Sequence, residues 1–168
     1  MASKLGRRTD QRMAMLKNQV TDLLWYGKIE TTLQRAKSVS AMAEKLLTVA
    51  INSYDDTVKV KKSVKNAKGE IVETEFVNDG AKKLNARRKL MAELYDVQEL
   101  KQDGESKSAY QARIKDIKHP LIEKIFNVYA PKYAKRNQEN NQGGGYTRIL
   151  KLGKRRGDDA EAVIIELV

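Results

Sequence analysis

The chain has 168 residues and carries 33 lysines and arginines against 22 aspartates and glutamates, which gives a formal net charge of +11. Its hydrophobic content of 40% is enough for a folded core at this length and excludes a disordered tail. The absence of cysteine excludes disulfides, and no apolar run approaches the roughly 20 residues of a membrane-spanning helix or resembles a secretory signal. We therefore expect a cytoplasmic protein that binds a polyanion and no membrane.

Residues 1–8 are expected to form a basic arm, because three cations surround Gly6 and little in the segment can be buried. From Thr9 onward apolar residues recur at three- and four-residue steps until Gly27, which predicts an amphipathic helix. The residues that form its stripe are Met13, Leu16, Val20, Leu23 and Leu24.

A short extended piece is expected over 28–31, followed by a second helix that runs to about residue 53. Thr31 and Gln34 have the spacing of a capping box, which predicts the start of that helix.

Residues 54–80 alternate apolar and polar side chains on both sides of a turn with Gly69 in the left-handed position, which predicts a β-hairpin. Five lysines against six carboxylates give it a net charge of −1, so the basic excess lies elsewhere. A turn is expected over 78–80. A third helix is predicted over 81–95, with four apolar residues facing inward: Leu84, Leu90, Met91 and Leu94.

Residues 96–119 are expected to be a surface excursion with a short helix near 107–117. Pro120 should start another helix that ends before Pro131, and the polar, glycine-rich run 137–145 predicts a flexible loop.

Two strands, 146–152 and 162–168, are expected to complete the chain. The predicted fold class is α+β, with helices packed on a small mixed or antiparallel sheet that includes a C-terminal β-hairpin, plus the inserted β-hairpin.

The sequence contains few side chains that could support catalysis. The single histidine, His119, precedes a proline and is expected to be an exposed loop residue, and without cysteine no zinc site or nucleophilic pair can be built. No cofactor or small-molecule substrate is expected. A metal-dependent nuclease using Asp158, Asp159 and Glu161 is kept as an unfavoured alternative, because paired carboxylates beside a glycine are usually solvated turn residues.

Two short segments contain most of the excess positive charge. Residues 1–17 have a net charge of +4 and residues 146–157 have +5, and arginine predominates in both. The planar fork of arginine suits phosphate oxygens, and the glycines in each segment let the backbone approach a phosphate. Tyr146 stands at the start of the second segment and is interpreted either as a base-stacking ring or, slightly favoured, as a core aromatic.

These features favour RNA over DNA, because no predicted element resembles a helix that reads a major groove. Basic arms that project from a small core suit irregular folded RNA, whose shape and phosphates are read. A DNA-binding protein and some other RNA-binding protein remain alternatives.

The sequence resembles the bacterial large-subunit ribosomal protein L17 family over about 1–53, 81–95 and 121–168. The matching words occur in family order: Lys4-Leu5-Gly6-Arg7, Ile29-Glu30-Thr31-Thr32, Arg35-Ala36-Lys37, Ala86-Arg87-Arg88, Ala130-Pro131-Lys132-Tyr133, Gly144-Gly145-Tyr146-Thr147-Arg148-Ile149, Lys151-Leu152-Gly153, Arg155-Arg156-Gly157-Asp158 and Ile164-Ile165-Glu166-Leu167.

The resemblance implies a non-enzymatic constituent of the large ribosomal subunit, in one domain over 1–168, that binds rRNA near the nascent-chain exit and contacts ribosomal protein L32. Segments 54–80 and 96–119 look like insertions, and the nearly neutral 54–80 hairpin is expected to face solvent or a protein rather than RNA. The residues expected to face RNA are Lys4, Arg7, Arg8, Arg12, Lys17, Arg35, Arg88, Tyr146, Arg148, Lys151, Lys154, Arg155 and Arg156.

Overall fold

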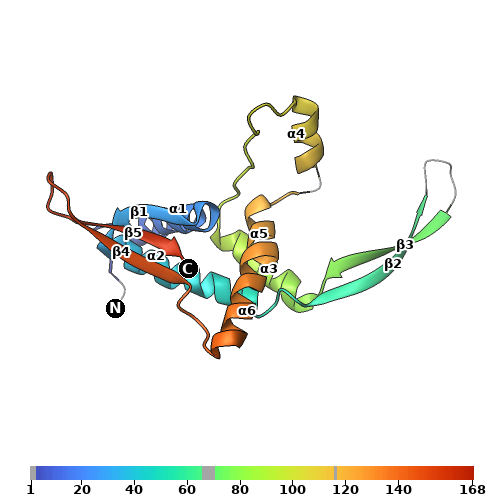
Figure 1. The fold of residues 1–168 in the computed structure, drawn as a ribbon, viewed down its shortest axis with the longest axis horizontal. Coiled ribbons are helices and arrows are strands. Elements are labelled where there is room, and N and C mark those ends of the chain that lie inside the picture. Colours follow the sequence, from blue (N-terminus) through green and yellow to red (C-terminus); the bar gives the residue numbers. More distant parts are fainter. Residues whose placement is uncertain (1–2, 66–70, 116) are drawn as a thin grey trace.

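The computed structural model describes residues 3–65, 71–115 and 117–168. Its body contains an antiparallel sheet in the order β1 (Lys28–Thr32), β5 (Glu161–Leu167) and β4 (Thr147–Lys154). Helices α1 (Thr9–Tyr26) and α2 (Leu33–Ile51) pack against this sheet (Figure 1). The predicted α+β class and the C-terminal hairpin are confirmed, and β1 extends the sheet on the other side of β5.

Helix α1 follows the predicted stripe. Its buried apolar side chains recur at three- and four-residue steps, from Leu16 to Leu24, and enter the same core as the buried side of α2. Gly27 ends the helix in the left-handed conformation, with φ of 83°, and its N–H donates to the Leu23 carbonyl at 2.8 Å. A glycine adopts this conformation without the steric cost that a side chain would add.

The predicted capping box is wrong. Thr31 lies inside β1, where it pairs with Val163 of β5, and its hydroxyl accepts a hydrogen bond from the Gln19 side chain at 3.1 Å. Helix α2 instead begins at Leu33 and ends at Ile51. Pairing with β5 thus decides the conformation of Thr31, although the local sequence pattern is also compatible with the start of a helix.

The inserted hairpin is confirmed as β2 (Thr57–Lys65) and β3 (Ile71–Asp79), which pair antiparallel along their whole length. It projects away from the body (Figure 1). The predicted turn at Gly69 lies outside the described residues, and the turn expected over 78–80 is wrong, because Asn78 and Asp79 belong to β3 and Gly80 caps the next helix.

Helix α3 (Ala81–Glu93) contacts the core along a narrow stripe. Leu90 and, just beyond the helix, Leu94 are buried as predicted. Leu84 and Met91 are not, with 38% and 41% of their surface exposed, because the buried side of α3 is the one that carries Ala86 and Leu90.

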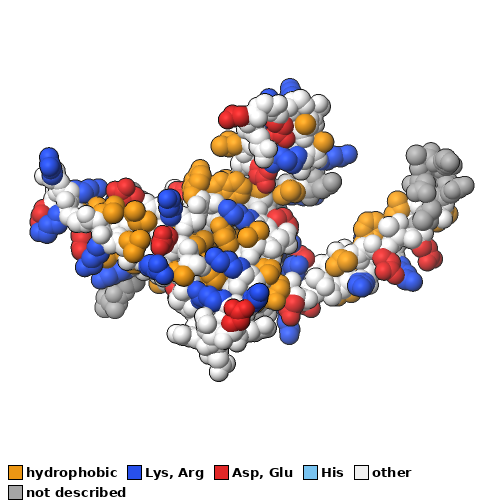
Figure 2. Space-filling model, in the orientation of Figure 1, with side chains coloured by type: hydrophobic (Ala, Val, Ile, Leu, Met, Phe, Trp, Pro, Cys, Tyr) orange, Lys and Arg blue, Asp and Glu red, His pale blue; other side chains and the backbone are white. Residues whose placement is uncertain are grey.

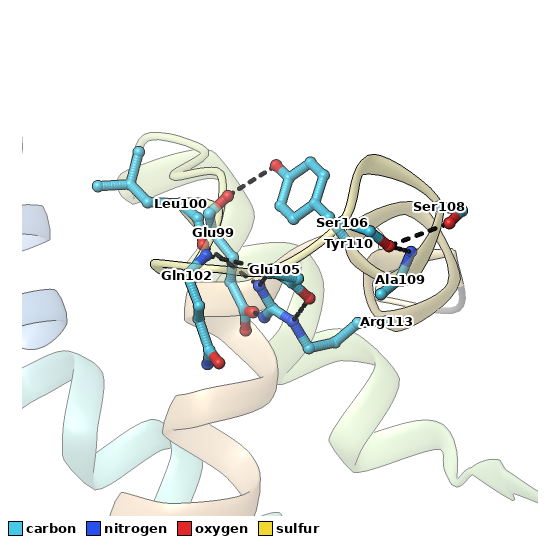
Figure 3. A network of polar contacts seen from close by, with 9 residues as sticks. All are labelled: Glu99, Leu100, Gln102, Glu105, Ser106, Ser108, Ala109, Tyr110 and Arg113. Atoms are coloured by element: carbon cyan, nitrogen blue, oxygen red, sulfur yellow. Dashed lines mark hydrogen bonds and ion pairs between the residues drawn. The ribbon is translucent and has the colours of Figure 1, made fainter.

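The excursion contains the expected short helix, α4 (Lys107–Ile114), and a compact polar network holds it (Figure 3). The Arg113 guanidinium donates to the carboxylates of Glu99 and Glu105 and to the Leu100 carbonyl. The Tyr110 hydroxyl donates to the Glu99 carbonyl at 2.8 Å. The lobe therefore depends on one arginine that links three parts of its chain.

Pro131 does not end the preceding helix. Helix α5 (Pro120–Lys124) passes through a π-helical turn, η1 (Ile125–Tyr129), into α6 (Ala130–Asn140) without a break. In the π turn the Ala130 N–H donates to the Ile125 carbonyl five residues back, and this wider turn accommodates the proline, which lacks an N–H. The loop predicted from residue 137 therefore starts only after Asn140.

Candidate nucleic-acid interface

The N-terminal arm is a tight turn held on the body. The Arg7 N–H donates to the Lys4 carbonyl at 3.1 Å, and Leu5 between them packs partly against the core. Lys4, Arg7 and Arg8 are exposed, and Arg8 forms an ion pair with Asp10 at 2.7 Å. The hydrogen bond from Arg8 lowers the pKa of the Asp10 carboxyl. The backbone of the arm is thus held against the body while its cations face solvent.

The tip of the β4–β5 hairpin is closed by its own hydrogen bonds. The Arg155 N–H donates to the Ala160 carbonyl at 3.0 Å, and the Asp159 N–H donates to the Arg155 carbonyl at 3.1 Å. The Arg155 guanidinium binds the Asp158 carboxylate with two hydrogen bonds, and the Lys154 ammonium binds Asp159 at 2.6 Å. These contacts hold two of the predicted RNA-facing cations in defined positions.

The remaining hairpin cations also meet carboxylates. Arg148 lies 3.8 Å from Glu166 on the facing strand, and Lys151 lies 3.0 Å from Glu161. Five cations and four carboxylates therefore leave residues 146–168 with a net charge of only +1. Among the described residues no carboxylate forms an ion pair with Arg156, so this guanidinium at the tip is open to an anion.

The arm and the hairpin tip lie at the same end of the molecule along its long axis (Figure 1). Figure 2 shows lysine and arginine side chains gathered there, with carboxylates between them. Two segments that are about 150 residues apart in the sequence thus lie at one end of the molecule.

Three other predicted residues stand apart from these projections. Lys17 is partly buried and bound by groups of its own chain, because its ammonium donates to the Ala92 carbonyl at 2.9 Å and pairs with Glu93 at 3.3 Å, which ties α1 to α3. Arg35 is half-buried near the start of α2, and Arg88 is exposed on α3. Of the three, Lys17 is the least available to a phosphate.

Tyr146 belongs to the core. Only 2% of its surface is exposed, and its ring lies 4.9 Å from the Tyr133 ring, with the Arg136 guanidinium 5.0 Å from its centre. Its hydroxyl forms a hydrogen bond with the Asn137 side chain at 2.9 Å. Placement of Tyr146 among the base-contacting residues is therefore corrected: the ring packs α6 against the sheet and is inaccessible to a base.

Sequence reasoning missed two basic residues of this region. Arg136 donates to the carbonyls of Gly144 and Gly145 and so fixes the glycine-rich link into β4. Lys45 lines a groove of about 500 Å³ between α1 and α2, together with Ser3 of the arm and Arg12 of α1. The spacing of Lys37, Ala41 and Lys45 on one exposed face of α2 is the signal that could have identified it.

The carboxylates of the nuclease alternative are occupied by cations. Asp158, Asp159 and Glu161 each bind an arginine or lysine of the hairpin. Within residues 3–65, 71–115 and 117–168 no group of three or more acidic or histidine side chains is arranged to hold a metal ion. His119 is half-buried rather than exposed, and its Nδ1 lies 3.3 Å from Asp96.

Comparison with known proteins decides the family. The model of the family "Ribosomal protein L17" matches residues 15–168. The chain is 41% identical to the large ribosomal subunit protein bL17 of Lachnospira eligens, over 98% of this chain and 97% of the relative. It is 38% identical to the proteins of that name from Acetivibrio thermocellus and Clostridium tetani, over 98% of this chain and 97% and 96% of theirs.

The chain belongs to the ribosomal protein L17 family. It is a bacterial ribosomal protein, structural and not enzymatic, and its place is the ribosome in the cytoplasm. In the part of the chain that the structure describes, the helices are all too short or too polar to cross a bilayer.

Proposed function

We propose that this L17 protein is a structural constituent of the large ribosomal subunit that binds and stabilises large-subunit rRNA near the nascent-chain exit. The observation that supports the proposal most is the placement of the arm and the β4–β5 tip at one end of the molecule, where both present arginines. The names of the relatives support the large subunit as the place of action.

The chemistry of this interface is phosphate neutralisation without turnover. Arg7, Arg12 and Arg156 have planar donor groups that match phosphate oxygens, and binding releases counterions from the RNA. At the hairpin, Lys154 and Arg155 must exchange a carboxylate for a phosphate. Because of this exchange, a nearly neutral hairpin can enter an rRNA fold. It also favours rRNA sites whose phosphates fit the positions of these cations, in preference to polyanions in general.

The proposed function also includes contacts with neighbouring ribosomal proteins. The chain acts as one domain over 1–168 whose family core binds rRNA and neighbouring proteins, with L32 among them. Segments 54–80 and 96–119 are additions to that core. The compact core that joins α1, α2, α3, α5, α6 and β5 supports this organisation.

Salt-dependent binding to large-subunit rRNA tests the proposal. If six or more phosphates are engaged, affinity should fall about a thousandfold or more between 50 and 200 mM salt. Arg7→Ala with Arg12→Ala, and separately Arg155→Ala with Arg156→Ala, should each weaken binding and reduce the log–log salt slope by about 1.5. Lys59→Ala with Lys61→Ala, on β2, removes the same charge and should leave the slope unchanged.

An unchanged slope in both arginine variants would refute the interface. The alternatives have their own readouts. Efficient competition by duplex DNA would favour a DNA-binding protein, and RNA cleavage in the presence of magnesium would favour the nuclease. Sedimentation with the large subunit, with release only at high salt, is the expected behaviour of the whole protein.

A further inference from the structure

The projecting β2–β3 hairpin has two chemically different faces. Residues opposite each other in its register share a face, so Val60 lies with Phe76, and Val58 and Val64 lie on the same side by alternation. Lys62 is the one charged residue among them, and its ammonium lies 5.6 Å from the centre of the Phe76 ring. These side chains are exposed to solvent: 50% for Val58, 41% for Val64 and 39% for Phe76. In Figure 2 hydrophobic side chains follow one side of the projecting ribbon.

The other face is mainly charged. Lys59, Lys61, Glu73 and Glu75 lie on it, and Lys61 pairs with Glu75 at 3.7 Å. Two exposed apolar residues, Ile71 and Val77, lie on this face as well. Figure 2 shows basic and acidic side chains along the opposite side of the ribbon. A two-stranded ribbon is only marginally stable alone in water, and exposure of its apolar face to water is unfavourable.

The base of the hairpin is anchored to the body. The Asp56 carboxylate accepts from the backbone N–H of Lys82 at 2.8 Å and so caps α3, and the Asp56 carbonyl accepts from Gly80. A Cβ at Gly80 would lie 2.4 Å from that carboxylate, so this contact requires glycine.

A second set of contacts acts at the same place. Asp79, the last residue of β3, binds Arg87 at 2.6 Å, and Arg87 also binds Glu123 of α5. The hairpin therefore leaves the body in a fixed direction, and nine-residue strands extend it by about 30 Å. A fixed arm with an apolar face is arranged to reach a surface outside its own chain.

We propose that the apolar face of β2–β3 docks on an apolar surface of a different protein in the large ribosomal subunit. The charge distribution selects this occupant. A hairpin segment of net charge −1 in a chain of +11 has no excess cation for RNA, and the charge of the whole chain opposes a second copy. The inference rests on the proposed place in the large subunit but not on the RNA contacts of the arm and tip.

Site-specific photocrosslinking in assembled large subunits tests the docking. A photoreactive phenylalanine analogue replaces Val64 on the apolar face or, as the control, its neighbour Ser63 on the charged face, in the full chain. We expect a crosslink to one ribosomal protein from position 64 and none from position 63. Val60→Ser with Phe76→Ser should abolish the crosslink, whereas Lys61→Ser with Glu75→Ser should retain it.

The outcomes separate this inference from the proposed function. A chain that does not sediment with the large subunit refutes the proposed function. A chain that sediments normally but gives no crosslink from position 64, equal crosslinks from 63 and 64, a crosslink to rRNA, or one to a second copy of itself refutes the docking alone.

Discussion

The Arg155 guanidinium holds the Asp158 carboxylate through two hydrogen bonds, of 2.6 Å and 3.0 Å, at the tip of the β4–β5 hairpin. The hydrogen bond lowers the pKa of Asp158, so the carboxylate is charged whenever the arginine could meet a phosphate. Binding of RNA at this point is therefore a competition between two anions for one cation.

Removing the competing carboxylate should strengthen rRNA binding. Asp158→Asn is expected to raise affinity about two- to fivefold, because exposed ion pairs are weak and their loss costs the free protein little. Filter binding at fixed salt measures the change. Glu139→Gln, which removes a carboxylate paired with Lys135 on α6, is the matched control. Weaker binding by Asp158→Asn would mean that the Asp158 carboxylate orients Arg155 for the phosphate instead of competing with it.

Tyr146 should matter for stability and not for RNA recognition. Its replacement by alanine empties a buried site between α6 and the sheet and should cost about 3–5 kcal/mol of unfolding free energy. Tyr146→Leu fills part of that space and is expected to fold at low temperature. Its rRNA affinity there should equal that of the unchanged protein, whereas a base-stacking role would reduce it by about tenfold or more.

The hydroxyl of Tyr133 is buried without a hydrogen-bond partner among the described residues. Tyr133→Phe should therefore leave unfolding free energy unchanged or raise it by about 1 kcal/mol at neutral pH. Burial also raises the pKa of Tyr133 from 10.0 to about 12. The folded state thus keeps a proton that the unfolded chain releases near pH 10, so stability falls as pH rises from 10 toward 12.

Guanidinium unfolding at pH 7 and pH 11 tests both statements about Tyr133. The phenylalanine variant should lose less stability between the two pH values than the unchanged protein. Equal losses would show that this tyrosine does not ionise on unfolding.

The Asp79 carboxylate should make stability depend on acid pH. Burial disfavours its charge, but hydrogen bonds from Arg87 and Lys83 outweigh burial and lower its pKa below 3.8. Its contribution is therefore complete above about pH 4 and is lost as pH falls through the lowered value. Asp79→Asn should cost about 1–2 kcal/mol at pH 7 and progressively less below pH 4.

Urea unfolding between pH 2 and pH 7 measures this effect. Glu73→Gln, an exposed carboxylate of the same hairpin, is the control and should change stability little at any pH. A constant difference between Asp79→Asn and the unchanged protein would contradict the assignment.

The main helices could be predicted because the spacing of their apolar residues matches the side that is buried: Leu16, Val20 and Leu23 face one core at helical spacing. The last strand is a short apolar run, 162–165, which is typical of a central strand, and β5 is the central strand of the sheet. The predictions at Thr31 and Pro131 were wrong because neither outcome depends on the local sequence pattern alone. Strand pairing with β5 places Thr31 in β1, and a π turn lets the helix continue through Pro131.

The candidate interface was predictable only in part. Cations such as Arg7 and Arg156 are visible in the sequence, but their carboxylate partners decide which of them are available. Asp158 and Asp159 follow the basic run directly, so a count that ends at residue 157 overstates the charge of the hairpin. Tyr146 beside a basic segment is equally compatible with a core ring and a surface ring until Tyr133 and Arg136 are placed.

The π turn at Ile125–Tyr129 sets the rotational phase of α6, which continues from it. One extra residue in the turn rotates the next helix by about 100° relative to an unbroken α-helix. That rotation places Tyr133 under Tyr146 while Ile125 and Phe126 remain buried on the preceding turn. Regular α-helical winding at the present length would turn Tyr133 away from the sheet, whereas a homologue that lost one residue here could wind regularly and keep the contact, so the π turn and the length of this stretch should change together.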